Sequence, residues 1–207
     1  MKNNDELKGS CACGNVKYKI EGKPLFTQAC HCKNCKLSTG SSYVIHTMIM
    51  EDFETIYGGC ICGSIKYSIN SKPLFTQVCH CLDCKKLTGS SYVMNTSIFD
   101  NSLEISGELL KAELIAGSGK KCTHYFCKKC GVYIYADYEF AIGRLTVRTK
   151  TLLKPKNFPP QAHIFVKNKD PWINIVNKDI CYDEMYDPKI AWPKESLDRY
   201  KKYLETN

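Results

Sequence analysis

The chain contains 207 residues, of which 43% are hydrophobic and 24% are charged, and its formal net charge is +8. These values are typical of a soluble protein with one ordinary domain or two small ones. They argue against a membrane helix, because no stretch approaches the roughly 18 consecutive apolar residues that one requires. The polar start MKNNDELKGS lacks the apolar core of a secretory signal, so we expect a reducing, cytoplasmic location and no membrane partner.

The first predicted feature is an internal duplication. Residues 9–56 align without a gap to 58–105 at an offset of 49, and about 27 of the 48 aligned positions are identical. Residues from about 106 onward have no second copy. We therefore expect a truncated first copy at 1–51, a complete domain at 52–180 and a tail with a helix at 181–207.

The predicted elements along the chain are mostly short strands rich in β-branched and aromatic residues. The segment 81–89, CLDCKKLTG, is expected to form one helical turn closed by Gly89. After Pro193, apolar residues recur at Leu197, Tyr200 and Leu204, which predicts a short C-terminal helix. The fold class is therefore all-β. The expected strands are 16–20, 64–69, 90–99, 132–138, 144–152 and 163–168.

The fourteen cysteines are the most informative residues. Two cysteines separated by one residue point to opposite sides of an extended chain and do not pair easily. In a reducing compartment, clustered CxC and CxxC groups are more typical of metal sites than of disulfides. Thiolates are soft ligands that suit zinc better than magnesium or calcium.

The second copy and the unique half together offer seven clustered thiols. Four ligands make a closed structural zinc site, whereas a catalytic zinc keeps one position open, so we divide the seven into four and three. Two distant pairs would form the closed site: Cys60 and Cys62 with Cys127 and Cys130. The open site would then consist of Cys79, Cys81 and Cys84. The first copy supplies Cys11, Cys13, Cys30, Cys32 and Cys35 but no CxxC pair.

The order GGCICG, CHCLDCKKLTG, FCKKCG, followed by PPQAHIF and PW, resembles the glutathione-dependent formaldehyde-activating (GFA) family, which includes centromere-protein-V-like proteins. The resemblance covers about residues 52–176. It implies a β-tent fold with two zinc ions per complete domain. The four-cysteine site would be structural, and Cys79, Cys81 and Cys84 would hold the catalytic zinc. The implied activity is that of a carbon–sulfur lyase, which condenses glutathione with formaldehyde to S-(hydroxymethyl)glutathione.

Two departures from the family stand out. Lys85 occupies a position where the family commonly has arginine, so bidentate carboxylate recognition would be lost. The first copy is also foreign to a single-domain protein, and we expect it to form an accessory arm or to pair with the edge of another chain, as in a homo-oligomer. The alternative function is a non-catalytic zinc module for nucleic acid or protein partners, because the positive charge is compatible with either.

Other polar residues have both an ordinary and a functional interpretation. We expect His80 and His31 to point away from the metal, and His124 and His163 to be structural. Cys122 and Cys181 fit no motif and are expected to be buried thiols. Thr88, Ser90 and Ser91 could form a turn or bind substrate. Sheet packing explains the alternating tyrosines better than a base-stacking platform does; these are Tyr92, Tyr133, Tyr135 and Tyr138.

Overall fold

The computed structural model describes residues 7–20, 24–49, 53–116, 119–176 and 180–206, and the chain divides into two compact units, Met1–Phe53 and Glu54–Asn207. Within the described residues, no helix is long and apolar enough to cross a membrane.

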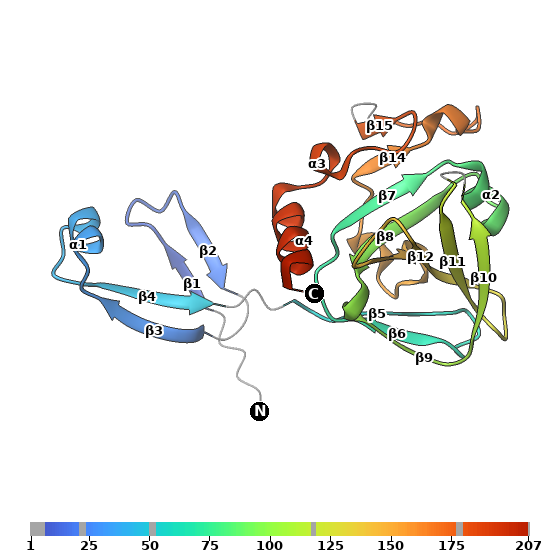
Figure 1. The fold of residues 1–207 in the computed structure, drawn as a ribbon. Coiled ribbons are helices and arrows are strands. Elements are labelled where there is room, and N and C mark those ends of the chain that lie inside the picture. Colours follow the sequence, from blue (N-terminus) through green and yellow to red (C-terminus); the bar gives the residue numbers. More distant parts are fainter. Residues whose placement is uncertain (1–6, 21–23, 50–52, 117–118, 177–179, 207) are drawn as a thin grey trace. The chain divides into compact units, whose positions relative to one another are not determined.

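The described residues of the first unit form two separate antiparallel hairpins and one short helix (Figure 1). Its elements are β1 (Leu7–Ser10), β2 (Lys17–Ile20), β3 (Pro24–Cys30), α1 (Lys33–Thr39) and β4 (Val44–Ile49). None of the side chains whose burial is described in this unit is buried. The unit therefore has secondary structure but no hydrophobic core among these residues.

The second unit contains an eight-stranded sheet in the order β10-β11-β12-β13-β8-β7-β14-β15 and a three-stranded sheet β5-β6-β9 (Figure 1). Neighbouring strands are antiparallel except that β14 runs parallel to both β7 and β15. The strands are β5 (Ile56–Gly59), β6 (Lys66–Ile69), β7 (Phe75–Cys79), β8 (Val93–Phe99), β9 (Leu103–Ser106), β10 (Leu109–Ile115), β11 (Lys121–Cys127), β12 (Tyr133–Tyr138), β13 (Arg144–Arg148), β14 (Ala162–Ile164) and β15 (Cys181–Tyr182). The α-helices are α2 (Leu82–Thr88), α3 (Pro188–Ala191) and α4 (Lys194–Thr206). The all-β prediction with a short C-terminal helix is confirmed.

Several elements differ from the sequence-based expectation in their extent. The helix α2 has seven residues instead of one turn, and Gly89 closes it in the left-handed conformation at φ 62°. The strand predicted at 144–152 ends at Arg148 and continues as a 3₁₀ turn, Thr149–Thr151. The strand predicted at 163–168 ends earlier, because Phe165 adopts a φ of 55° and opens another 3₁₀ turn.

The core of the second unit lies in two main clusters of buried side chains. One joins the two sheets, where Ile65 and Ile69 pack with Ile98, Ile134 and Val147, all 0% exposed. The other lies where the C-terminal segment returns to the sheet; its buried members include Phe75, Tyr186 and Trp192, with Leu197, Tyr200 and Tyr203 packed against it. Residues 181–206 thus contribute β15, α3 and α4 to the packing of this unit.

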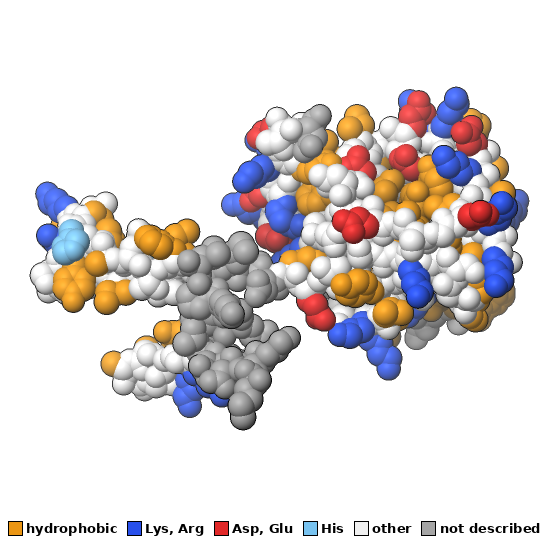
Figure 2. Space-filling view, turned by 90° about the horizontal axis from the view of Figure 1, so that it is seen from below, with side chains coloured by type: hydrophobic (Ala, Val, Ile, Leu, Met, Phe, Trp, Pro, Cys, Tyr) orange, Lys and Arg blue, Asp and Glu red, His pale blue; other side chains and the backbone are white. Residues whose placement is uncertain are grey.

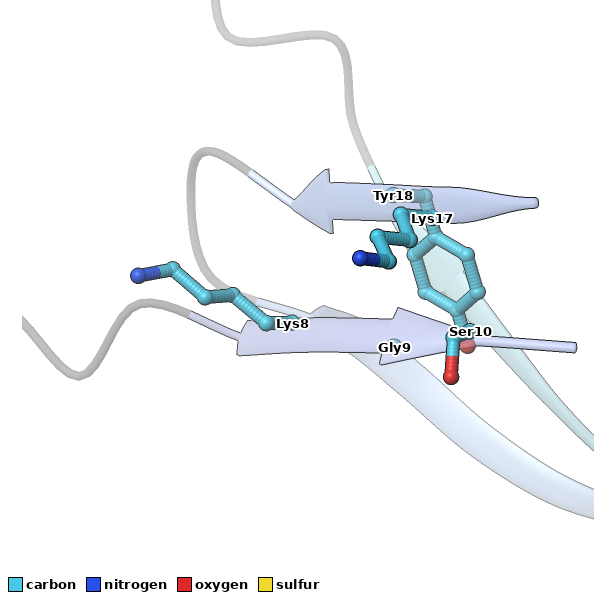
Figure 3. Close-up of a pocket in the computed structure, with 5 residues that line it drawn as sticks. All are labelled: Lys8, Gly9, Ser10, Lys17 and Tyr18. Carbon is cyan, nitrogen blue, oxygen red and sulfur yellow. The ribbon is translucent and has the colours of Figure 1, made fainter. Parts of the chain in front are cut away.

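The same close contact between a tyrosine and a glycine occurs within the first hairpin of each copy. Tyr67 lies opposite Gly58 in the β5–β6 pair, and a Cβ at Gly58 would lie 2.1 Å from the ring, so only glycine fits. Tyr18 lies over Gly9 in the same way, with a distance of 2.2 Å (Figure 3).

The surroundings of the two tyrosines differ. Tyr67 is 4% exposed, and its hydroxyl lies 2.6 Å from Thr151 Oγ1. Tyr18 is 55% exposed and borders an open hollow of about 540 Å³ that is lined by the two strands of its hairpin (Figure 3). The difference follows from the duplication, because the first copy has no counterpart of residues beyond 105.

Candidate metal centres

The first candidate centre is formed by two similar turns. In the turn after β5, the Gly63 N–H donates to the Cys60 carbonyl at 3.1 Å, and Gly63 has a φ of 74°. In the turn after β11, the Gly131 N–H donates to the Cys127 carbonyl at 2.8 Å, and Gly131 has a φ of 70°. The positive φ values favour glycine at both positions. These turns bring together four Sγ atoms, all within 4.8 Å of one another: those of Cys60, Cys62, Cys127 and Cys130.

The sulfur spacing fits a tetrahedral zinc site. With a zinc–sulfur bond of about 2.3 Å, the sulfurs of a tetrahedron lie about 3.8 Å apart. The Cys62 Sγ atom lies 3.4 Å from Cys60 Sγ and 3.7 Å from Cys127 Sγ. A hydrogen bond from the Ser64 hydroxyl lowers the pKa of Cys62 to about 6, while burial raises the pKa of Cys127 to about 11. A closed four-thiolate site at this point would link β5 to β11.

The second candidate centre lies where β7 meets α2. Cys79 is the last residue of β7, Cys81 is the N-cap of α2, and Cys84 lies in the first turn of the helix. The Cys84 N–H donates to Cys81 Sγ at 3.4 Å, which caps the helix with a sulfur atom. The three Sγ atoms lie within 4.8 Å of one another, and Cys79 and Cys84 are only 4% and 5% exposed. Three thiolates fit zinc and leave one coordination position for another ligand.

A buried arginine accompanies this second centre. Arg148, on β13, is 4% exposed, donates from Nη1 to Asn95 Oδ1, and lies with its guanidinium carbon 3.8 Å from the centre of the Tyr133 ring. The pKa of Cys84 is lowered to about 3, first by hydrogen bonds from the thiols of Cys79 and Cys81 and then by the charge of Arg148. Three thiolates with a divalent ion carry one net negative charge, and Arg148 can offset it. Sequence reasoning missed this residue.

Lys85 follows the triplet but is engaged elsewhere. Its ammonium group pairs with the Asp170 carboxylate and donates to the Asn168 carbonyl at 3.0 Å. The hydroxyls after α2 also have local partners: Thr88 donates to the Cys84 carbonyl at 2.8 Å, and Ser90 donates to the Tyr92 carbonyl at 2.7 Å. Ser91 Oγ accepts a hydrogen bond from the Trp172 indole at 3.2 Å. Thr88 and Ser90 thus make the local contacts of a turn, whereas Lys85 and Ser91 contact the segment at 168–172.

The histidines of the second unit lie outside both cysteine groups. His80 is 0% exposed, and its Nε2 lies 3.2 Å from His163 Nδ1. Burial lowers the pKa of His80 to about 4 and also lowers that of His163. His124 is buried and hydrogen-bonds to the Tyr133 hydroxyl.

The remaining cysteines and tyrosines take ordinary packing positions. Cys122 is buried, whereas Cys181 is half-buried on β15. None of the fourteen cysteines, all of which are described, forms a disulfide. Tyr133 belongs to a third, smaller core cluster and Tyr138 packs against it. Tyr135 stacks on Tyr125 with 4.2 Å between ring centres, and the Tyr92 ring centre lies 5.7 Å from that of His80.

The fold and these clusters define a class: an all-β protein with closely spaced thiols that could bind zinc. The model of the family described as "Glutathione-dependent formaldehyde-activating enzyme" matches residues 6–56 and 55–168, so the chain belongs to this GFA family. The first match falls on the first copy, and the second covers the second copy together with the unique half as far as residue 168. A Rhodobacter sphaeroides protein with a crystal structure is 19% identical, with a TM-score of 0.39, over 47% of this chain and 87% of that chain. No curated protein matches significantly.

Proposed function

We propose that the second unit is a zinc-dependent carbon–sulfur lyase that acts on a thiol adduct of a small aldehyde, such as S-(hydroxymethyl)glutathione. The observation that carries this proposal is the separation of the two cysteine groups. One group has four sulfurs and is complete, whereas the other has three and leaves a ligand position for substrate. A purely structural site has no need of an open position.

The proposed reaction joins a thiol to an aldehyde carbon. The carbon–sulfur bond forms, the carbonyl π bond breaks, and the thiol proton ends on the carbonyl oxygen; the reverse step restores both reactants. Bound zinc would supply a Lewis acid that lowers the pKa of a thiol and polarises a carbonyl oxygen. In this proposal Cys79, Cys81 and Cys84 hold the metal, and Arg148 offsets the charge of the thiolates. The burial of Cys79 and Cys84 keeps the sulfur side of the site away from water.

The alternative, a nucleic-acid-binding zinc module, requires basic side chains gathered on one face. On the face of the second unit visible in Figure 2, basic and acidic side chains are interspersed. Lys85, Lys128 and Lys167 each pair with a carboxylate. These features support the enzyme over the binding module.

The test is a direct assay of thiol–aldehyde exchange. The zinc-loaded chain is mixed with glutathione and ¹³C-formaldehyde, and the interconversion of free and thiol-bound carbon is followed by NMR exchange spectroscopy. We expect exchange above the uncatalysed rate, lost in Cys81→Ser and kept in Cys13→Ser, a change at a first-copy cysteine that belongs to none of the three cysteine groups. Exchange in Cys81→Ser equal to that of the unaltered chain would contradict the proposal, provided that both variants fold and retain the four-cysteine metal.

A further inference from the structure

The first unit repeats the geometry of the three-cysteine cluster. Cys30 ends β3, Cys32 caps α1, and the Cys35 N–H donates to Cys32 Sγ at 3.4 Å, as in the second unit. The Sγ atoms of these three residues lie within 4.8 Å of one another. Gly40 closes α1 in the left-handed conformation at φ 66°. The triplet is therefore formed without any part of the unique half of the chain.

A fourth donor lies beside Cys35 of this triplet on the neighbouring strand, although it is not within 4.8 Å of all three sulfurs. His46 lies on β4, and its Nε2 atom lies 3.4 Å from Cys35 Sγ. In the β3–β4 pairing, Gln28 lies opposite His46 and Cys30 lies opposite Val44. Residues two apart on a strand share a face, so the pairing places His46 on the same face of the hairpin as Cys30.

The position of His46 is one of those at which the two copies differ. At the repeat offset of 49, the second copy has Asn95, whose side-chain oxygen accepts the hydrogen bond from Arg148. The first copy has no counterpart of Arg148, because it lacks the unique half. An imidazole is a good zinc ligand, whereas an asparagine amide is not among the usual ones. The substitution thus supplies a donor only in the copy that lacks the arginine.

We propose that Cys30, Cys32, Cys35 and His46 form a closed Cys₃His zinc site that stabilises the first unit, in contrast to the open triplet of the second. This site goes beyond the proposed catalytic function and does not depend on it.

The first unit needs such a site because its apolar packing is poor. Most of its large apolar side chains whose burial is described are solvent-exposed; Phe26 is 55%, Leu37 72% and Ile45 62% exposed. Units of this size rarely fold on a small core alone and commonly use a metal or disulfides. The Cys11–Cys13 pair joins no group of three among the described residues. The Cys₃His set is therefore the metal site that this unit can complete by itself.

The experiment measures zinc per chain in the full-length protein purified under reducing conditions, using zinc alone as the probe. We expect His46→Asn to hold one zinc fewer than the unaltered chain, and the affinity of the lost site to fall by more than about 100-fold, because even outer-shell changes cost 10–100-fold. His31→Asn is the matched control: it lies between Cys30 and Cys32, and its ring packs on Tyr43 with 5.6 Å between centres. We expect this variant to keep its zinc.

A ligand swap separates coordination from a merely structural effect of His46. The His46→Cys variant should retain the zinc, and its ¹¹³Cd-substituted form should show the corresponding NMR signal shifted from a Cys₃His to a Cys₄ environment. The proposal is overturned if His46→Asn keeps all its zinc with unchanged affinity, if His31→Asn loses the zinc instead, or if His46→Cys also loses it.

Discussion

Replacing Cys127 with serine should remove a ligand from the closed four-cysteine site and prevent stable folding of the second unit. Cys127 is 1% exposed within the core cluster that joins the two sheets. A structural zinc supplies about 10–16 kcal/mol of apparent binding free energy, and the whole stability of a domain is about 5–15 kcal/mol. Loss of this site therefore removes most or all of the stability of the unit.

Cys122→Ser is the matched control, because Cys122 lies on the same strand, is also 1% exposed and belongs to neither metal group. Burying a hydroxyl in place of a thiol there should cost about 1–3 kcal/mol. For a unit of this size, that cost lowers Tm by about 2–12 °C. The assay is thermal unfolding by circular dichroism together with zinc content. Equal losses of Tm in the two variants, with equal zinc, would refute a structural metal site at Cys127.

Three further predictions follow from the packing. Arg148→Met should lower the free energy of unfolding of the zinc-loaded chain in urea by about 3–5 kcal/mol, because the cysteine thiolates beside it lose their buried positive partner. Arg148→Lys keeps the charge and should cost less. Unchanged stability in the methionine variant would contradict this. Tyr67→Phe should lower the free energy of unfolding by about 0.5–1.5 kcal/mol, because the hydroxyl loses its hydrogen bond. Tyr18→Phe should lower it by less than about 0.5 kcal/mol. Equal effects of the two changes would be inconsistent with the different burial of the two tyrosines. Deletion of residues 1–51 should leave a folded, active, zinc-loaded protein, because every buried residue described lies at position 58 or beyond. The measurement is circular dichroism, and an unfolded deletion variant would contradict this prediction.

The elements best predicted from the sequence are those with a local cause. The duplication is visible by alignment, and the CxC and CxxC spacings identify the same cysteine groups that the turns at Cys60 and Cys127 bring together. Gly89 is recognisable as a helix stop, because a left-handed residue closes the helix there. The C-terminal helix follows from the spacing of Leu197, Tyr200 and Leu204.

The features that sequence reasoning missed depend on tertiary contacts. The alternation in β13 does not distinguish a solvent-facing arginine from a buried one, so the place of Arg148 beside Cys84 could not be predicted. The strands β9 and β10 carry exposed glutamates and a lysine, which weaken their β signal. His46 lies eleven residues after Cys35, and only the β3–β4 register brings the two together. A comparison of the two copies, which exposes the change from Asn95 to His46, could have identified this histidine.

We propose that the second unit carries two chemically different metal sites, one closed and one open. The most direct measurement is a crystal structure of the full-length, zinc-loaded chain with anomalous diffraction at the zinc edge. We expect one peak surrounded by the sulfurs of Cys60, Cys62, Cys127 and Cys130. We expect a second peak bound by Cys79, Cys81 and Cys84, with a non-protein ligand in the fourth position. A second peak with four protein ligands, or no peak at the triplet, would contradict it.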